Sequence, residues 1–135
     1  MSWRQSLVRI AGYEVEQLRK RLAEVIERRA EAEIRIVLHE AEGEAEARRA
    51  ASDPESGWYR VGYLAGWRLR RDALKAELAA LEQEEAGARD AVARAFEELK
   101  KYEQLQENAQ IREAKAEARR ETAALDELGL RRTAR

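Results

Sequence analysis

The chain of 135 residues contains no cysteine, one proline, seven glycines and eight aromatic residues. Without cysteine it has no disulfide, no thiolate metal ligand and no cysteine nucleophile. It also lacks a run of 18 or more apolar residues, so no membrane-spanning helix is expected. Its first six residues show no secretory signal pattern. The 26 basic and 27 acidic residues give a net charge of −1, which provides no general attraction to nucleic acid.

The residues that are abundant indicate long helices. Charged residues make up 39% of the chain, against about 25% in an average domain. Much of the 44% hydrophobic fraction is alanine, whose burial removes little apolar area, so a compact globular core is not expected. Apolar residues recur at alternating spacings of three and four from Val8 to Gly43, and again from Leu64 to Tyr102. This spacing is a heptad seam, the pattern of a coiled coil.

The two seams are separated at Ser52-Asp53-Pro54-Glu55. Asp53 is suited to cap a helix and Pro54 to its first turn, whereas proline inside a helix would break it. A short connection favours antiparallel neighbours. We therefore predict an all-α fold: a long two-helix antiparallel coiled-coil hairpin with an overhanging C-terminal helix. The single unit over 1–135 would comprise a helix over about 3–51, a turn at 52–53, a helix over about 54–128 and a frayed basic tail at 129–135.

A fold at residue 53 also predicts which residues face each other, although a shift of three or four residues stays open. In this register pairing ends near Glu103, and the rest of the second helix projects by ~35–40 Å at ~1.5 Å per residue. That overhang is either a floppy tail or a helix that binds a partner. The expected facing pairs are Val25 with Leu81, Leu18 with Ala88, Ala32 with Leu74, His39 with Trp67, Gly43 with Tyr63, and Arg29 with Glu77.

The sequence predicts no catalytic, cofactor or metal site. His39 is the only histidine, and its helix neighbours Arg35 and Ile36 provide no carboxylate for a metal pair. The glycines at 57, 62 and 66 match no phosphate-binding loop. We expect His39 to lie in the seam beside an aromatic residue. The protein is accordingly predicted to be no enzyme and to bind no small molecule.

A partner-binding site is predicted near the turn, where four aromatic residues and four arginines occur within fifteen residues. Tryptophan, tyrosine and arginine are enriched at the energetically dominant positions of interfaces. Alternatively, the aromatic residues close the end of the hairpin, and one cluster can do both. Aromatic residues with arginine also suit single-stranded nucleic acid, but the acidic run from Glu40 to Glu46 opposes that interpretation. The candidate residues are Trp58, Tyr59, Arg60, Tyr63 and Trp67.

The second half of the chain contains Lys-Lys-Tyr-Glu-Gln-Leu over 100–105, followed by Arg112, Arg119-Arg120-Glu121 and Leu125-Asp126-Glu127. These segments, in this order, resemble the C-terminal part of the family of the flagellar export protein FliJ. The segment from Tyr13 to Glu24 fits the N-terminal part, and residues 40–67 look like the version found in alphaproteobacteria. The resemblance implies a cytoplasmic component of the flagellar type III secretion apparatus, peripherally associated with the inner membrane at the flagellar base.

The resemblance further implies an antiparallel coiled coil similar to the stalk subunit of rotary ATPases. One end would enter the ring of the export ATPase hexamer, and the protein would contact the cytoplasmic domain of the export gate and escort export chaperones. The turn end would then bind gate or chaperone. An alternative is a nucleic-acid-binding or self-associating arm, with Ile34, Val37 and Leu38 pairing hairpins. The residues expected to face the ATPase ring are Trp3, Leu7, Leu99, Tyr102, Leu105, Ile111, Leu125 and Asp126.

Overall fold

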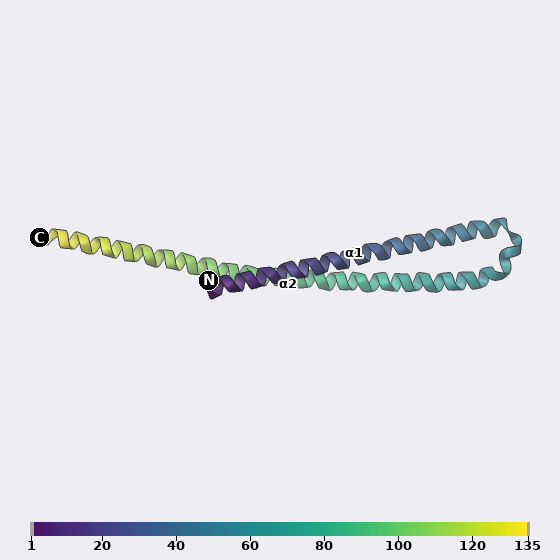
Figure 1. Ribbon diagram of the computed structural model, residues 1–135, viewed down its shortest axis with the longest axis horizontal. Helices are drawn as coiled ribbons and strands as arrows, with labels where there is room; N and C mark the ends of the chain where they lie inside the picture. The colour runs from purple at the N-terminus through teal and green to yellow at the C-terminus, as the bar shows by residue number, and fades with distance from the viewer. Residues whose placement is uncertain (1, 135) are drawn as a thin grey trace. The chain divides into compact units, whose positions relative to one another are not determined.

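The structure, a computed structural model, describes residues 2–134 apart from the side chain of Ser56. In this range the chain forms helix α1 (Trp3–Ser52), a short 3-10 helix η1 (Pro54–Ser56) and helix α2 (Gly57–Thr133), with no strand. The two long helices pack against each other and are joined by one turn (Figure 1). The predicted all-α helical hairpin is confirmed.

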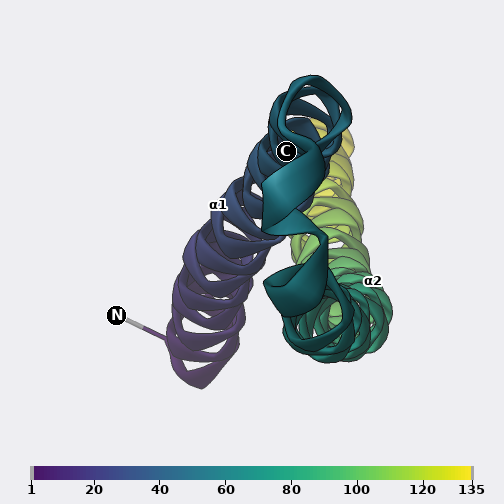
Figure 2. The ribbon, with the colours of Figure 1, turned by 90° about the vertical axis from the view of Figure 1, so that its right-hand side faces the viewer.

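The turn is built as its sequence indicates. Asp53 has an extended backbone (φ −131°, ψ 94°), and its carboxylate accepts a hydrogen bond of 3.2 Å from the Glu55 N–H. This bond satisfies an amide that the start of the helix leaves without a partner. Pro54 then starts a single 3-10 turn, so the α-helix begins at Gly57 rather than at residue 54. Figure 2 looks onto this turn, where the chain crosses from α1 to α2.

Both helices contribute to each of two compact units. The first, the turn unit, comprises residues 17–93, and the second, the terminal unit, comprises residues 1–16 and 94–135. That residues 1–135 form a single domain stays a prediction.

The core of the turn unit is narrow and consists mainly of small and branched side chains. Val25 and Ala32 are fully buried in α1, and Leu74 and Leu81 are buried in α2. Three polar seam residues, His39, Glu46 and Glu85, are buried with them. Such a core removes little apolar area per residue, so the polar contacts at its edges help to set the register.

The predicted pairing of Arg29 with Glu77 is wrong. Arg29 contacts Glu85 at 3.0 Å, and Glu77 pairs with Arg35 at 2.8 Å. The 3-10 turn lengthens the connection and moves the midpoint of the hairpin beyond residue 53. Arg29 therefore reaches Glu85, which lies about two helical turns after the expected partner Glu77 in α2.

Pairing in the terminal unit extends further along α2 than predicted. Ala11 and Val15 of α1 and Ala95 and Ala109 of α2 are buried, and Arg4 lies 3.8 Å from Glu113. The expected end of pairing near Glu103 is therefore wrong by about three turns.

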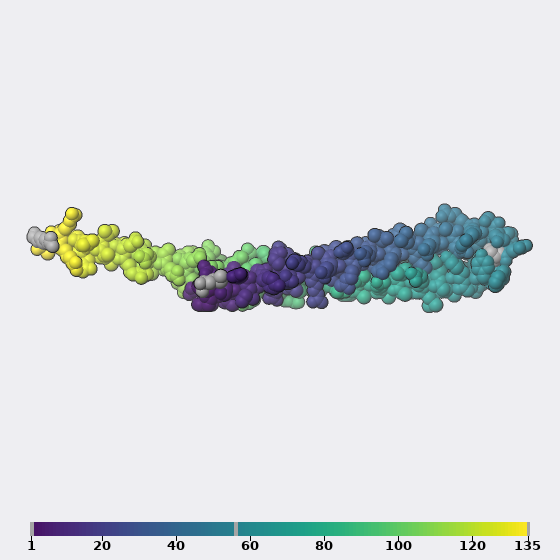
Figure 3. Space-filling view, in the orientation of Figure 1, coloured from purple at the N-terminus to yellow at the C-terminus, as the bar shows by residue number. Residues whose placement is uncertain are grey.

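The projecting end of α2 is helical as far as Thr133. Every residue from 117 to 134 is exposed, yet the helix continues to Thr133. Residues 129–133 of the predicted frayed tail are thus helical here, Arg135 lies outside the described residues, and the fraying of this segment stays a prediction. Figure 3 shows this segment in yellow, beyond the part of α2 that the purple start of α1 covers.

Candidate partner-binding surfaces

His39 of α1 and Trp67 of α2 hold the two helices together in the turn unit. Their rings stack with centroids 4.9 Å apart and an interplanar angle of 12°. His39 Nε2 lies 2.9 Å from the Trp67 carbonyl oxygen, and the indole N–H of Trp67 donates a 3.0 Å hydrogen bond to the His39 carbonyl oxygen. The predicted pairing of His39 with an aromatic seam residue is confirmed.

Gly43 lies one turn after His39 and makes room for the Trp67 indole. A Cβ added to Gly43 would lie 2.6 Å from Nε1 of Trp67, closer than van der Waals contact allows. The expected neighbour, Tyr63, lines the same groove, but Trp67 is the residue that approaches Gly43 closely. A small residue opposite a large one thus sets the spacing of the helices here.

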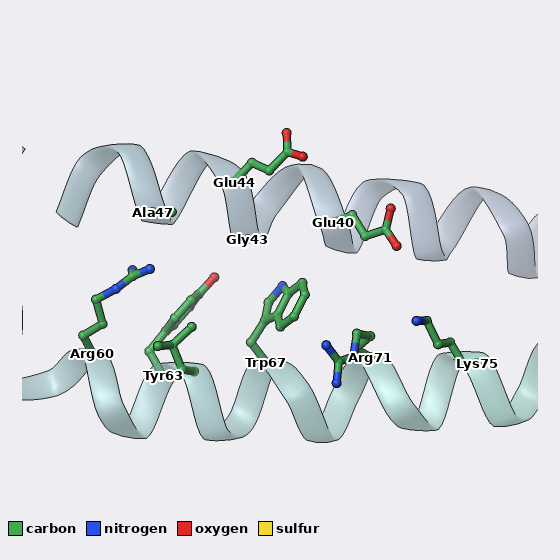
Figure 4. Close-up of a pocket in the computed structure, with 10 residues that line it drawn as sticks. Glu40, Gly43, Glu44, Ala47, Arg60, Tyr63, Trp67, Arg71 and Lys75 are labelled. Carbon is green, nitrogen blue, oxygen red and sulfur yellow. The ribbon is translucent and has the colours of Figure 1, made fainter. Parts of the chain in front are cut away.

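A groove of about 410 Å³ opens beside this contact. Figure 4 shows Arg60, Tyr63 and Trp67 extending from α2 toward α1, with Gly43 opposite Trp67. Acidic side chains border the groove on α1, and basic side chains border it on α2. Its lining comprises Glu40, Gly43, Glu44, Ala47, Arg60, Tyr63, Leu64, Trp67, Arg71 and Lys75.

The five residues predicted to bind a partner near the turn divide into two groups. Trp67 and Tyr63 are half-buried and line the groove between the helices. Trp58 is 84% exposed and Tyr59 is 39% exposed, and their rings meet edge to face at 5.6 Å. Trp58 and Tyr59 are therefore free to contact another molecule, whereas Trp67 mainly joins the helices.

Arg60 completes this region. It is half-buried, and its Nη1 atom is enclosed without a hydrogen-bond partner among the described residues. An enclosed guanidinium nitrogen retains its need for an acceptor. Arg60 thus lines the groove with one guanidinium nitrogen that lacks an acceptor among the described residues.

The residues predicted near the chain ends divide in the same way. Leu7, Leu99 and Tyr102 are half-buried. Trp3 is 63% exposed, Leu105 49%, Ile111 45% and Leu125 68%, and Asp126 is also exposed. The structure brings the first three into the paired region and leaves the other five accessible.

Tyr102 interacts with acidic residues of both helices in the terminal unit. A hydrogen bond to Glu98, one turn earlier in α2, and the negative charge of Glu98 raise the pKa of the Tyr102 phenol. Partial desolvation and the charge of Glu14 in α1 contribute in the same direction. These interactions favour the neutral, hydrogen-bond-donating form of the phenol over the phenolate.

The projecting part of α2 carries an apolar stripe that the sequence prediction did not identify as a unit. Its members recur at helical spacing and lie on one face. This face is turned by about a third of a turn from the face that packs on α1. The helical spacing of these residues is visible in the sequence, but two of them are alanines, which make the apolar pattern weak. The stripe consists of Ile111, Ala114, Ala118, Leu125 and Leu128.

Neither metal clusters nor membrane spans are found in the described part of the chain. Within residues 2–134, no group of three or more histidine or acidic side chains is placed to hold a metal ion. Over the same residues, neither helix has a stretch apolar enough, at sufficient length, to cross a bilayer.

Two curated proteins are similar to the chain over nearly its whole length. Both are named flagellar FliJ protein, from Caulobacter vibrioides strains NA1000 / CB15N and ATCC 19089 / CIP 103742 / CB 15. Each is 52% identical over 132 residues, which cover 98% of this chain and 95% of the relative. No family model matches the chain, and no solved structure matches it. With this identity over almost all of both sequences, the chain belongs to the family of flagellar FliJ proteins.

Proposed function

We propose that this protein is a non-enzymatic component of the flagellar type III export apparatus. It acts as a stalk that binds the export ATPase ring at one end and the cytoplasmic domain of the export gate at the other. It also escorts export chaperones. The observation that carries the proposal is the exposed helix over 117–133, which continues α2 beyond the region paired with α1.

The projecting helix has the dimensions and the surface of an inserting element. From residue 117 to Thr133 it extends by about 25 Å at ~1.5 Å per residue. A single polar helix of this length is marginal in water, so a partner that covers its apolar stripe would stabilise it. An amphipathic helix that lies in a groove uses anchors at this kind of spacing. Ile111, Leu125 and Leu128 are the large anchors of the stripe.

Contacts with the ATPase ring are therefore assigned mainly to the exposed members of the predicted set. Leu125 and Asp126 lie on the projecting helix, and Ile111 lies just before it. Trp3 and Leu105 are exposed in the paired region of the terminal unit. Leu7, Leu99 and Tyr102 support these residues by packing the two helices together.

The turn end is proposed to bind the gate or a chaperone. Trp58 and Tyr59 supply exposed aromatic surface, and Arg60 supplies an enclosed guanidinium nitrogen that lacks an acceptor. These are the residue types that dominate interface energetics. Tyr63 and Trp67 hold the helices in place beneath them. The complex would form in the cytoplasm, at the membrane-embedded gate.

The proposal is tested first with the purified export ATPase. The full chain should increase ATP hydrolysis, whereas a chain ending after Ala116 should bind and stimulate weakly, because it lacks residues 117–135. Leu125→Glu should reduce stimulation in the same way, since it places a charge in the apolar stripe. Undiminished stimulation by the shortened chain would exclude this helix as the coupling element.

Reciprocal variants separate the two ends of the molecule. Trp58→Ala should leave ATPase stimulation unchanged and weaken capture of the gate domain or of a chaperone. Leu125→Glu should show the opposite pattern. Loss of both activities in both variants, with unchanged helicity by circular dichroism, would contradict the assignment of separate ends.

A further inference from the structure

The outer face of α2 in the turn unit carries large apolar side chains that no part of the hairpin covers. Trp58 is 84% exposed, Val61 78% and Leu69 73%. Helical spacing places them on one face, opposite the face that contains Trp67 and Leu74. Gly62, on the same face, has open space where a Cβ would lie. We call this surface the α2 outer face.

The rim of the α2 outer face is basic. Arg68 and Arg70 are exposed on its two sides. Neither forms an ion pair within the described range 2–134, and the nearby Asp72 pairs with Arg71 at 3.2 Å. From Arg60 to Lys75 the helix carries five basic residues and a single acidic one.

A second uncovered apolar face lies on α1. Ile34 is 58% exposed, Val37 63% and Leu38 57%. Helical spacing places Ala41 and Ala45 on the same face. We call this surface the α1 outer face.

The rim of the α1 outer face is acidic over residues 27–44, because the arginines in this stretch pair with glutamates of α2. Arg28 pairs with Glu84 at 2.6 Å, Arg29 with Glu85 at 3.0 Å and Arg35 with Glu77 at 2.8 Å. All three arginines are therefore occupied by α2 of the same molecule. Between residues 27 and 44, the exposed charges along the rim that are not paired with another described residue are glutamates, namely Glu27, Glu31, Glu40, Glu42 and Glu44, and Arg48 is an exposed basic residue beyond the end of this stretch.

We propose that the partner of each face is a second copy of this chain, with the α1 outer face of one molecule docked on the α2 outer face of the next. The apolar centres match in chemistry, and the acidic rim of one meets the basic rim of the other. The small residues Gly62 and Ala65 on α2 leave space for the branched side chains of Ile34, Val37 and Leu38. The pairing buries apolar surface that a monomer leaves in water.

Charge excludes the two symmetric alternatives. Contact between two α1 outer faces would set glutamates against glutamates, and contact between two α2 outer faces would set arginines against arginines. The interface therefore joins unlike surfaces, which each molecule carries once. Such a head-to-tail contact adds further copies side by side rather than stopping at a dimer. It uses neither the projecting helix nor the groove.

The first test measures the association of the full chain by sedimentation equilibrium over a wide concentration range at low salt. Wild-type chain should form dimers and higher species whose proportion rises with concentration and falls with added salt. Val37→Glu/Leu38→Glu should weaken association by about tenfold or more, because it places charges in the centre of the α1 outer face. Val61→Lys/Leu69→Lys should do the same for the α2 outer face.

A mixing experiment distinguishes contact of unlike faces from contact of like faces. Each double variant retains one intact face, so an equimolar mixture should form a dimer and no larger species. A mixture that stays monomeric, while wild type associates, would overturn the proposal. Wild-type chain that stays monomeric at all concentrations would also overturn it.

Two controls keep these outcomes interpretable. Ile10→Lys alters a residue of similar exposure, 64%, outside both faces, and should associate like wild type. Circular dichroism and thermal unfolding should show each variant as helical and as stable as wild type, because the altered side chains are exposed. Charge exchange gives an independent check: Arg68→Glu/Arg70→Glu alone and Glu31→Arg/Glu42→Arg alone should each lose self-association, whereas a mixture of the two variants should associate.

Discussion

The imidazole of His39 and the indole of Trp67 each engage the backbone carbonyl of the other residue, and their rings stack between the helices. Two polar contacts and one ring stack thus join α1 and α2 at this position. Because carbonyl positions are fixed by the helices themselves, this contact sets both the separation and the register of α1 and α2 in the turn unit. Its integrity is the first property that variants can test.

Gly43→Ala should destabilise the hairpin. The new Cβ would lie 2.6 Å from the Trp67 indole nitrogen, so the indole must move and strain its hydrogen bond. Overpacking of this kind costs about 1–3 kcal/mol, against a gain of up to about 1 kcal/mol from replacing glycine in a helix. Urea denaturation should therefore show a net loss of free energy of unfolding.

Gly87→Ala is the matched control for this substitution. Gly87 lies in the same helix as Trp67, and nothing lies within 4 Å of the position that its Cβ would occupy. This variant should be more stable than wild type by up to about 1 kcal/mol. Equal effects at the two glycines would show that the fit to Trp67 does not limit the stability of the hairpin.

The buried Glu85 should depend strongly on its arginine partners. It contacts Arg29 at 3.0 Å and Arg89 at 3.2 Å, and its side chain is only 11% exposed. Arg29→Leu should therefore cost about 1–3 kcal/mol, because a buried carboxylate loses its partner from α1. The double variant Arg29→Leu/Glu85→Leu should recover most of this loss, as denaturation can measure.

A surface pair in the same register provides the comparison. Arg28 and Glu84 are 2.6 Å apart, but their side chains are 52% and 40% exposed. Arg28→Leu should cost no more than about 1 kcal/mol. A larger loss at Arg28 than at Arg29 would mean that burial of Glu85 is not the dominant factor.

Sequence patterns predicted the helices and the partner of His39 but not the partner of Arg29. The heptad spacing from Val15 to Val25 requires only local periodicity, which a sequence displays directly. The partner of Arg29 depends on how many residues the turn consumes, and the 3-10 conformation at Pro54–Ser56 could not be read from the Asp-Pro signal alone. A seam that repeats every seven residues also accepts a shift along the helix with little change in apolar contacts.

The hydrogen-exchange rates of the backbone amides should differ between the parts of α2 before and after Ala116. Amides between Ala95 and Ala109 lie in the paired region and should exchange slowly, whereas those from 118 to 133 should exchange fast, because no packed face protects them. Mass spectrometry of peptides from each segment can measure this difference. Slow exchange throughout α2 in the isolated chain would indicate that the projecting helix is stabilised without a partner.

Tyr102 should titrate at higher pH than an unperturbed tyrosine. Because the Glu98 carboxylate accepts its hydrogen bond and repels a phenolate, Glu98→Gln should lower the pKa of Tyr102. The stabilising effect of this interaction is present at neutral pH and is lost as the pH rises through the raised pKa. Tyrosinate absorbance in a background of Tyr13→Phe, Tyr59→Phe and Tyr63→Phe can follow the titration.

Glu97→Gln is the control for the titration of Tyr102. It removes the same charge one residue earlier on the helix, from a side chain that does not contribute to the shift. The pKa of Tyr102 should move less than in Glu98→Gln. An equal change of the Tyr102 pKa in both variants would mean that the overall negative charge near Tyr102, and not the hydrogen bond to Glu98, raises this pKa.

The candidate surfaces were only partly predictable from the sequence. Composition identified Trp58, Tyr59 and Trp67 together, because aromatic residues near arginine mark interfaces. It could not separate Trp58, which faces water, from Trp67, which packs on Gly43, since that distinction requires the facing helix. Val61 and Leu69 were missed because a surface face outside the seam gives a weak periodic signal.

The acceptors of the His39–Trp67 contact belong to the main chain, which every residue type supplies. Substitutions at neighbouring exposed positions, such as Tyr59 or Arg68, therefore leave the His39–Trp67 contact unchanged. The end of the hairpin can accept a new set of recognition side chains while the framework beneath stays in place. The side chains that would select a partner are thus different from the atoms that set the helix register, and each set can be redesigned without disturbing the other.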